Sequence, residues 1–387
     1  MPILNRAVEF QAEVAGWRQH LHQHPEIGYE VHETAAFVAA RLKEFGVDEI
    51  ATGIGRTGLV GIIHGSKGAG PTIGLRSDMD ALPMAEETGL PYASVNAGKM
   101  HACGHDGHMA MLLGAAKYLS ETRNFNGSVA VIFQPAEENG AGGEAMVKDG
   151  MMERFGIKEV YGMHTLAQMP LGEFATRVGP IMGATDEYII TITAVGGHAA
   201  YPHDSIDPIV IGAQLVGMLQ TIAARNVDPM ESVVLTITQF NAGTALNIIP
   251  EVATLAGTIR TLNQDVRAFA VKRLHEICAG VALAHGINIH VNHMPGYPVT
   301  VNNEGETQNA IEAAANVVGP KAVDDNMPAS LGAEDFSYMA MARPGAFMFI
   351  GNGDTPYVHH PKFNFDDNAI PFGVSYWASL VQHRLGA

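Results

Sequence analysis

Cysteine is almost absent from this sequence, since only two of its 387 residues, Cys103 and Cys278, carry a thiol. They lie far apart and show no pairing pattern, which excludes a disulfide scaffold and fits a reducing compartment. Basic residues are also few, because 23 Lys and Arg stand against 40 Asp and Glu, for a formal net charge of −17. Clustered basic side chains bind phosphate backbones and anionic lipids, so we expect no nucleic-acid or membrane partner.

Long apolar runs are missing as well. No uninterrupted stretch reaches the roughly 18 residues that span a bilayer. Residues 1–17 carry Glu9 and Glu13 and lack the basic start and apolar stretch of a secretory signal, so we expect a cytoplasmic protein. The hydrophobic share of 47% supports a large core, and the length predicts two domains, because single cores stop growing near about 250 to 300 residues.

The first part of the chain alternates between strand-like and helix-like periodicity. Glycine-punctuated apolar runs predict strands at 58–65 and 72–77, a helix begins near His105, and further strands follow at 128–134 and 160–164. This alternation is typical of an α/β fold with a mixed, mostly parallel sheet and helices on both faces.

From about residue 185 the pattern changes to strand, helix, two strands, helix and strand. That order is the βαββαβ arrangement of a ferredoxin-like module. We therefore predict a discontinuous main domain, formed by residues 1–183 and 296–387, into which a smaller module of residues 184–295 is inserted. The predicted elements of the module are 188–193, 208–224, 232–239, 252–261, 266–285 and 287–292.

Side chains that can bind metals or transfer protons follow predicted strands of the main domain. The carboxyl ends of strands in an open α/β sheet form the crevice where ligands bind, so we expect these groups to converge on one rim. They are Asp78, Asp80, Glu137, Glu138, His164 and His359.

Cys103 and His105 stand two residues apart at a predicted helix start and can face one point. Thiolate, imidazole and carboxylate are the ligands of zinc and similar ions. An isolated pair of this kind would indicate a buried thiol and a helix-start residue, but the neighbouring strand-end groups favour a metal site. His101 and His108 are the nearest candidates to support it.

The adjacent Glu137 and Glu138 follow an apolar strand. Two such carboxylates repel each other, and partial burial is costly without a cation. With one carboxylate on a metal ion, the other can act as general base toward a water molecule that the ion makes more acidic. The alternative is a solvated loop pair that caps the helix near Gly143.

In the inserted module, Gly196 and Gly197 leave His198 on an open turn from which it can reach a ligand. Asn247 and the strand-end Arg260 suit the recognition of a carboxylate, although Arg260 alone is equally consistent with a surface ion pair. His203 indicates a capping or surface position. His20, His22 and His24 lie on an amphipathic helix and its exit, and their spacing of two does not share a helical face.

Short motifs along nearly the whole chain carry a resemblance to a known family. They are His22–Glu26, Arg76–Pro83, His101–His108, Gln134–Glu138, Gly162–His164, Gly196–His203, Leu246–Pro250, Gly257–Arg260, Gly332–Phe336 and Val358–Pro361. Together they resemble the dinuclear metallohydrolases that include aminoacylases and glutamate carboxypeptidases. The most similar branch contains hippurate hydrolases and indole-acetyl-amino-acid hydrolases.

The resemblance implies a catalytic main domain that binds one or two divalent metal ions per subunit, with zinc ranked before manganese, cobalt or nickel. It makes Glu137 the general base and later proton donor, and Asp80 the orienting aspartate. Asp78 and Cys103 depart from the wider family, which has a histidine ligand and a bridging carboxylate, so one-metal and two-metal forms both stay open. The implied ligands are Cys103, His105, Glu138, His164 and His359, the last chosen over His360.

The resemblance further implies that the inserted module is a lid and dimerisation domain, and that the chain forms a homodimer or higher homo-oligomer. His198 would stabilise an oxyanion, in its own or the neighbouring subunit, and Asn247 and Arg260 would hold the carboxylate of a small-molecule substrate. Leu166 and Ala167 stand where relatives often carry an aromatic–proline pair, which implies an altered acyl pocket.

These features predict a metal-dependent amidohydrolase that cleaves N-acyl amino acids, of N-acetyl or N-benzoyl type, to a carboxylic acid and a free amino acid. A dipeptidase, a carboxypeptidase or a deacetylase of an N-acetylated biosynthetic intermediate would use the same groups. Two remoter alternatives are a hydrolase with Cys103 as nucleophile and a non-catalytic binder of metal or ligand.

Overall fold

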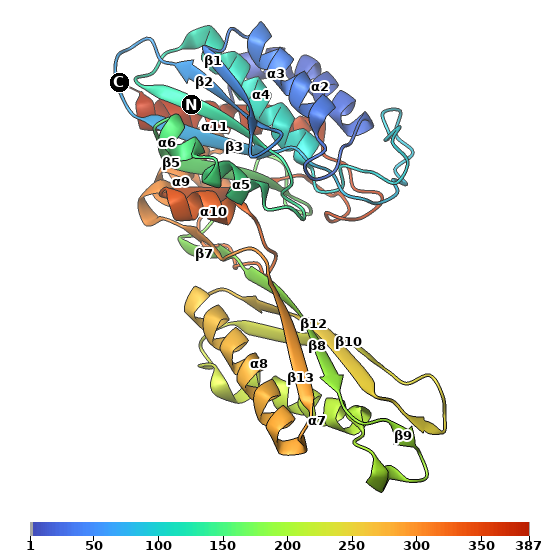
Figure 1. Cartoon of the computed structure of the whole chain (residues 1–387). Coiled ribbons are helices and arrows are strands. Elements are labelled where there is room, and N and C mark those ends of the chain that lie inside the picture. Colours follow the sequence, from blue (N-terminus) through green and yellow to red (C-terminus); the bar gives the residue numbers. More distant parts are fainter. Residues whose placement is uncertain (1–2, 387) are drawn as a thin grey trace. The chain divides into compact units, whose positions relative to one another are not determined.

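The computed structural model describes residues 3–386, which form two compact units (Figure 1). The first unit comprises the described residues up to Ile181, Val301–Pro328 and those from Asp335 onward. The second unit comprises Met182–Thr300 and Ala329–Glu334. The segment Ala329–Glu334, expected in the main domain, belongs to the second unit because Met182 pairs with Ser330 and the N–H of Gly183 donates to the carbonyl of Gly332.

The first unit is built on an eight-stranded sheet in the order β1-β2-β4-β3-β5-β16-β6-β15. Strand β3 runs parallel to β4 and β5, β16 runs parallel to β5, and β1 and β2 are antiparallel to their neighbours. The expected mixed, mostly parallel α/β sheet is confirmed. The strands are β1 (Glu49–Ile54), β2 (Gly58–His64), β3 (Thr72–Asp78), β4 (Ser128–Gln134), β5 (Ile157–Leu166), β6 (Phe174–Ala175), β15 (Val323–Asp324) and β16 (Gly345–Gly351).

Helices cover both faces of this sheet, as the alternation of side chains in β4 shows. Val129, Val131 and Phe133 belong to the core that the sheet forms with α2, α4, α9 and α11, whereas Ile132 is buried on the other face, where α5 and α10 pack together. The helices are α1 (Asn5–Glu9), α2 (Gln11–Gln23), α3 (His32–Glu44), α4 (His105–Thr122), α5 (Gly142–Lys148), α6 (Met151–Arg154), α9 (Glu304–Val318), α10 (Phe336–Ala342) and α11 (Ile370–Leu385).

Helix α4 is the most deeply buried of these helices and begins at a predicted ligand. Its first turn lies against Phe365, and a methyl group added at Gly107 would overlap the ring of Phe365. Glycine at this position therefore lets the start of α4, with His105, lie close to the loop that precedes α11.

The second unit has a four-stranded antiparallel sheet in the order β10-β12-β8-β13. Helices α7 and α8 share one apolar core with this sheet, and α8 begins at Asn263, whose side chain accepts the N–H groups of Asp265 and Val266. The elements are β8 (Ala184–Thr193), β9 (Gly197–His198), α7 (Pro208–Thr221), β10 (Val233–Ala242), β11 (Ile248–Ile249), β12 (Val252–Thr261), α8 (Gln264–His285) and β13 (Asn288–Pro295), while β7 (Gly179–Met182) and β14 (Thr300–Asn302) form a separate pair.

One described helical stretch, Pro208–Asn226, is long and apolar enough to cross a membrane by length and composition alone. Polar residues interrupt this stretch, so it did not count among the uninterrupted apolar runs considered from the sequence. Ile211, Leu215 and Leu219 are nevertheless buried in the core of the second unit. A core helix can have the same length and apolar composition as a membrane-spanning helix. The burial of these three side chains therefore assigns the helix to the core of the second unit.

Candidate metal centre

The five predicted ligands come together at the carboxyl end of the main sheet. Cys103 Sγ lies 3.3 Å from His164 Nε2, His105 Nε2 lies 4.0 Å from Glu138 Oε1, and His359 Nε2 lies 3.5 Å from the same oxygen. Cys103, His105 and His164 form one compact group, and Cys103, Glu138 and His359 form another. Because these groups share Cys103, all five side chains surround one small volume.

Hydrogen bonds to main-chain carbonyls orient two of these histidines. His105 Nδ1 donates to the carbonyl of Asp80 at 2.8 Å, and His164 Nδ1 donates to the carbonyl of Thr165 at 2.6 Å. A carbonyl can only accept, so the Nδ1 atom carries the proton in each ring. Nε2 is therefore the nitrogen of each ring that faces the centre, and once it has no proton it can bind a metal ion.

The centre fits a divalent cation. Among the described residues, His105 Nε2 and Glu138 Oε1 are buried without a hydrogen-bond partner, and such groups are costly unless something satisfies them. Burial alone would lower the pKa of His105, but the carboxylates of Asp78, Glu138 and Asp80 raise it to about 10. The surroundings of His105 thus favour positive charge, which a metal ion supplies.

Cys103 is suited to metal ligation and poorly suited to direct nucleophilic attack. Burial, together with the carboxylates of Glu138, Glu137 and Asp78, raises the pKa of its thiol well above the usual value. A cysteine nucleophile needs the opposite surroundings, because positive charge is what stabilises a thiolate. The cysteine-hydrolase alternative is therefore disfavoured by the charges around Cys103.

Glu137 is buried beside the ligand cluster, where its carboxylate lies close to the imidazole of His105 and the carboxylate of Glu138. The alternative of a solvated pair that caps α5 is wrong, because the N–H of Gly143 donates to Asp335 instead. The preceding residue, Ala136, adopts a left-handed conformation with φ 54°, which turns the chain sharply after β4.

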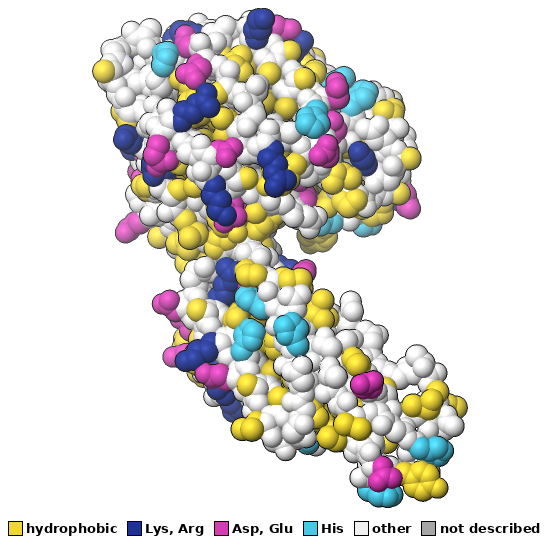
Figure 2. Space-filling model, in the orientation of Figure 1, with side chains coloured by type: hydrophobic (Ala, Val, Ile, Leu, Met, Phe, Trp, Pro, Cys, Tyr) yellow, Lys and Arg dark blue, Asp and Glu magenta, His cyan; other side chains and the backbone are white. Residues whose placement is uncertain are grey.

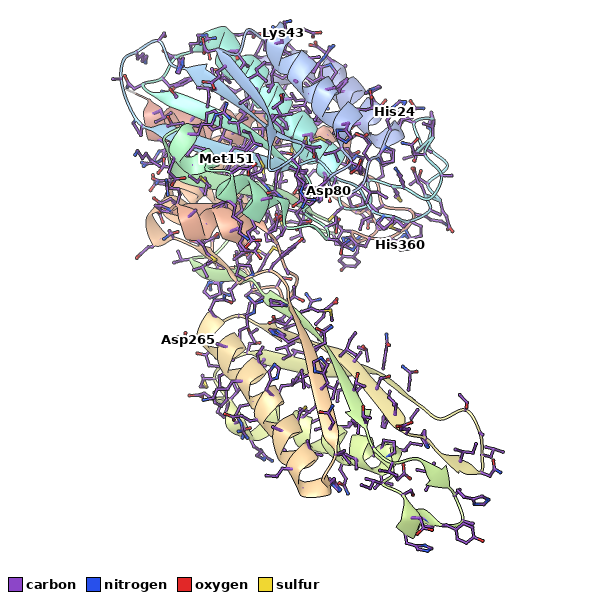
Figure 3. The ribbon with its side chains drawn as sticks, in the orientation of Figure 1. His24, Lys43, Asp80, Met151, Asp265 and His360 are labelled. Carbon is purple, nitrogen blue, oxygen red and sulfur yellow. The ribbon has the colours of Figure 1, made fainter. Side chains whose placement is uncertain are left out.

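Asp80 lies inside the first unit (Figure 3) and supports both sides of the centre. Its main-chain carbonyl binds His105, while its carboxylate accepts the N–H groups of Glu137 at 2.9 Å and Glu138 at 3.1 Å. The side chain therefore holds the paired glutamates, and the orientation of His105 depends on the main chain.

Histidine 359 is placed toward the centre by its own backbone. It adopts a left-handed conformation with φ 66°, and its N–H donates to the carbonyl of Ala102, next to Cys103. The neighbouring His360 accepts the N–H of Lys362 and is exposed (Figure 3). The geometry thus brings His359, and not His360, to Glu138.

In the second unit, the structure brings His198 beside Asn247. Strand β9 pairs with β11, the N–H of Ala199 donates to the carbonyl of Asn247, and both residues line one pocket of this unit. His198 Nδ1 accepts the N–H of Ala200, so a neutral ring carries its proton on Nε2. His198 is exposed and can therefore donate this Nε2–H to an oxygen atom.

Arg260 does not lie beside Asn247. Strand β12 begins at Val252, close to β11, and Arg260 follows eight residues later, which corresponds to roughly 27 Å along an extended strand. Arg260 is half-buried and donates to the carbonyl of Leu331 at 3.4 Å. One small carboxylate therefore cannot contact both side chains of the same chain. His203, as expected, is exposed.

Three buried residues with polar contacts near the centre were not singled out from the sequence as site residues. His22 was placed on an amphipathic helix and given no role, yet it is buried with Nδ1 2.8 Å from Asp106 and Nε2 3.3 Å from Glu86. Arg76 and Asp106 entered only as members of longer motifs. A charged residue in a strand with an otherwise apolar core, such as Arg76 in TIGLRSD, is the signal that could have found it.

Known proteins match this chain along almost its entire length. The model for peptidase family M20/M25/M40 matches residues 74–383. A hippurate hydrolase of Campylobacter jejuni is 40% identical over 384 residues and covers 98% of this chain and 99% of its own. An N-acetyl-L-cysteine deacetylase of Bacillus subtilis is also 40% identical, over 97% of this chain and 88% of its own.

A solved structure has the same fold. The YXEP protein of Bacillus subtilis, described as a dinuclear metal-binding peptidase of the M20 family, is 32% identical with a TM-score of 0.84. The match covers 97% of this chain and 98% of that one.

Proposed function

Because this chain belongs to peptidase family M20/M25/M40, we propose that it is a metal-dependent amidohydrolase that cleaves N-acyl amino acids to a carboxylic acid and a free amino acid. The observation that carries the proposal is the convergence of five ligand-type side chains on a centre where His105 Nε2 and Glu138 Oε1 are buried without hydrogen-bond partners. The buried carboxylate of Glu137 stands beside that centre.

Cys103, His105, Glu138, His164 and His359 would hold the metal ion. When bound, a divalent cation supplies Lewis acidity, which polarises an amide carbonyl and makes a water molecule more acidic.

Glu137 then accepts the proton of the attacking water and delivers it to the leaving nitrogen, so that the amide C–N bond breaks and a C–O bond forms. The carboxylate of Asp80 holds Glu137 in place by accepting the main-chain N–H of Glu137.

The acyl group defines the substrate class, and we propose N-acetyl and N-benzoyl amino acids. The relatives named as a hippurate hydrolase and an N-acetyl-L-cysteine deacetylase support both types. One pocket is lined by residues 166–170, just after His164 on the chain, and by residues 173–175, together with residues of the segment 321–328 that include Lys321 and Asp324. This pocket is our candidate for the acyl group. Dipeptides stay an alternative, because the same groups would hydrolyse a peptide bond.

Zinc ranks first among the metals we propose, with manganese, cobalt and nickel as alternatives, because the donor set of one thiolate, three imidazoles and a carboxylate suits borderline ions. A two-metal form is supported by the relative described as dinuclear. A one-metal form is favoured by Asp78, which is already bound by Arg76 and His108.

We propose that the second unit, approximately residues 184–295, is a ferredoxin-like lid and dimerisation domain. Its element order and its four-stranded antiparallel sheet support this topology. The edge strand β10 exposes Val234 and Phe240, and the adjoining α7 exposes Val210 and Met218, which gives an apolar surface for a second copy.

Two copies would also reconcile the substrate contacts. Asn247 and Arg260 lie far apart in one chain, so they can hold one substrate only if they come from different subunits. His198, beside Asn247, would then stabilise the oxyanion in the partner's site.

Other partners and location follow from composition. Basic side chains stand singly among acidic ones on the face in Figure 2, which supports a small-molecule partner over nucleic acid or a membrane. We propose a cytoplasmic location, in keeping with the two unpaired cysteines.

Glu137→Gln tests the function. The variant should bind metal as the wild type does and lose at least about 100-fold in kcat, because a general base is removed. Wild-type enzyme and variant should be assayed on N-acetyl and N-benzoyl amino acids and on dipeptides, with each of the four metals. Full activity of the variant would refute the role of Glu137, and inactivity of the wild type on the whole panel would refute the substrate class.

A mixing experiment tests the shared site. Glu137→Gln and His198→Ala are each expected to be nearly inactive, but hybrid dimers should contain one intact site if His198 acts in the partner. No recovery of activity in hybrids shown to form by mass would mean that each subunit uses its own His198.

A further inference from the structure

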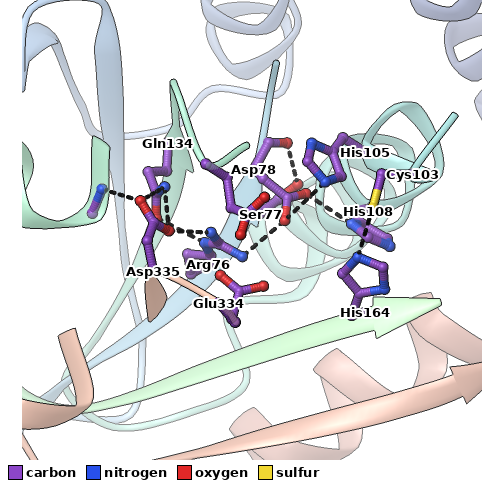
Figure 4. A network of polar contacts seen from close by, with 12 residues as sticks. Arg76, Ser77, Asp78, Cys103, His105, His108, Gln134, His164, Glu334 and Asp335 are labelled. Carbon is purple, nitrogen blue, oxygen red and sulfur yellow. Dashed lines mark hydrogen bonds and ion pairs between the residues drawn. The ribbon is translucent and has the colours of Figure 1, made fainter. Parts of the chain in front are cut away.

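Arg76 is a fully buried arginine on β3, the strand that leads to the metal centre (Figure 4). Its guanidinium donates from Nε to Gln134 at 2.9 Å, from Nη1 to Asp78 at 2.8 Å and from Nη2 to Asp335 at 2.9 Å. Burying a charged group is costly unless it is paired and hydrogen-bonded, and Arg76 meets both conditions with two carboxylates and an amide.

The far side of this cluster is held rigidly. The side-chain amide of Gln134 donates to both oxygens of Asp335, at 2.8 and 2.9 Å, and the N–H of Gly143 donates to Asp335 at 2.8 Å. Asp335 and Gln134 are therefore fixed by groups other than Arg76. A planar guanidinium that donates to two fixed acceptors can rotate little. The direction in which Nη1 donates to Asp78 is therefore fixed as well.

Asp78 connects the fixed guanidinium of Arg76 to the metal centre. Its Oδ1 is 2.7 Å from His108 Nδ1, its Oδ2 accepts from Arg76, and the same Oδ2 lies 3.7 Å from His105 Nε2. Without Arg76 and His108, a carboxylate so close to a ligand histidine could rotate toward the cation. With both oxygens engaged, Asp78 is held beside His105 as a fixed negative charge.

A second path leads from Asp78 to His164. His108 Nε2 accepts the main-chain N–H of Thr165 at 2.9 Å, so the proton of its ring is on Nδ1 and is donated to Asp78. The carbonyl of Thr165 in turn accepts the proton of His164 Nδ1. A continuous line of contacts thus runs from Asp335 through Arg76, Asp78, His108 and Thr165 to a metal-binding histidine.

We propose that Arg76 is a positioning residue for the metal centre, acting on His105 through Asp78 and on His164 through Asp78, His108 and Thr165. The inference rests on the proposed metal-dependent function, because it concerns the side chains that would hold the ion. Replacing groups that orient metal ligands typically weakens metal affinity by about 10- to 100-fold.

Arg76→Lys is the primary test, since lysine keeps the charge but cannot donate in three fixed directions. We expect the dissociation constant for Zn²⁺, measured by competition with a chromophoric chelator, to rise by about 10- to 100-fold. With Co²⁺ bound, the d–d and thiolate-to-metal absorption bands should shift relative to the wild type. Gln134→Met removes the acceptor of Arg76 Nε, and it should show a smaller change in the same direction. This variant replaces Arg76→Lys as the test if Arg76→Lys does not fold.

Arg384→Lys is the matched control. Arg384 makes a bidentate pair with Glu159 at 2.9 Å in the same unit but contacts none of the metal-binding side chains. It should lower the melting midpoint and leave the Zn²⁺ affinity and the Co²⁺ spectrum unchanged. If the Arg76 and Gln134 variants behave like this control, the proposal is overturned and the cluster only stabilises the fold.

These binding measurements do not depend on turnover. If the wild type hydrolyses no substrate of the panel while Zn²⁺ affinity falls in the order wild type, Gln134→Met, Arg76→Lys, the proposed function is wrong and the role of Arg76 stands. If substrates are hydrolysed but the three proteins share one Zn²⁺ affinity, the function stands and the role of Arg76 is refuted.

Discussion

The carboxylate of Asp80 accepts the main-chain N–H of Glu137 at 2.9 Å. Its second oxygen accepts the N–H of Glu138 at 3.1 Å. One buried side chain therefore positions both the proposed general base and a proposed metal ligand, and it uses both oxygens to do so. A neutral asparagine of nearly the same shape would offer one oxygen atom to these two N–H groups.

Asp80→Asn should reduce kcat by about 10- to 100-fold, because one N–H of the Glu137–Glu138 pair loses its acceptor, a loss of about 1 to 3 kcal/mol. The fold should persist, since asparagine has nearly the same volume. Steady-state kinetics and circular dichroism of the purified variant would check both points. A variant with wild-type kcat would show that the loop keeps its position without the carboxylate.

Metal removal should abolish activity and lower the melting midpoint. His105 Nε2 and Glu138 Oε1 lack hydrogen-bond partners, and a cation bound by the folded protein would satisfy them together with the surrounding carboxylates, whereas the unfolded chain has no such site. Differential scanning calorimetry of the protein before and after exhaustive chelation, and after re-addition of Zn²⁺, measures the effect. Glu137→Gln is the control, and it should gain stability from Zn²⁺ although it is inactive.

Stability should depend on the protonation of His22. Burial alone would lower its pKa, but Asp106 and Glu86 raise it to about 9. A group whose pKa is raised by folding contributes stability that is fully present below its unfolded value near 6.5 and is lost as the pH rises through about 9. The shift corresponds to about 3 kcal/mol.

The melting midpoint of the wild type should therefore fall between about pH 6.5 and pH 9, and His22→Gln should flatten this dependence. The other groups around His22 are Arg18, which donates to Asp106, the ring of Tyr92 and His101, whose pKa burial lowers to about 3. His101 is thus neutral across this range. His32 is exposed, and His32→Gln is the control. If the melting midpoint depends on pH in both variants as it does in the wild type, His22 is not the cause of that dependence.

Gly107→Ala should destabilise the first unit by about 1 to 3 kcal/mol, because the added methyl group would overlap the buried ring of Phe365. Gly16→Ala is a matched change in α2, where nothing lies near the new methyl group, and it should be neutral or slightly stabilising. Chemical denaturation of both variants measures the difference. Equal midpoints would show that α4 can move away from Phe365 at no cost.

Much of the metal centre could be predicted from the order of residues alone. His164 ends an apolar strand and Glu138 follows one, and the carboxyl ends of neighbouring parallel strands must meet at one edge. The same rule indicated Asp80, and the spacing of Cys103 and His105 indicated a shared direction. These predictions depend on local periodicity and on the topology of a parallel sheet, and both can be inferred from short stretches of sequence.

Only the tertiary structure shows which oxygen or nitrogen atom of each residue makes which hydrogen bond. Asp80 orients His105 through its carbonyl and the glutamates through its carboxylate, a division that no residue spacing reveals. Likewise, the spacing of His22 on its helix indicated no role, but its side chain is buried against Asp106, 84 positions away. Such contacts depend on side-chain directions across distant segments, which local sequence patterns do not encode.

The sequence by itself determined the kinds of groups in the site and the rim on which they meet, because strand order and chain direction place strand ends. Only the tertiary structure showed that the length of β12 separates Asn247 from Arg260, and that Asp335 is joined to His164 through Arg76, Asp78, His108 and Thr165. The physical reason is that hydrogen bonds and distances between segments far apart in the chain arise only when those segments pack together.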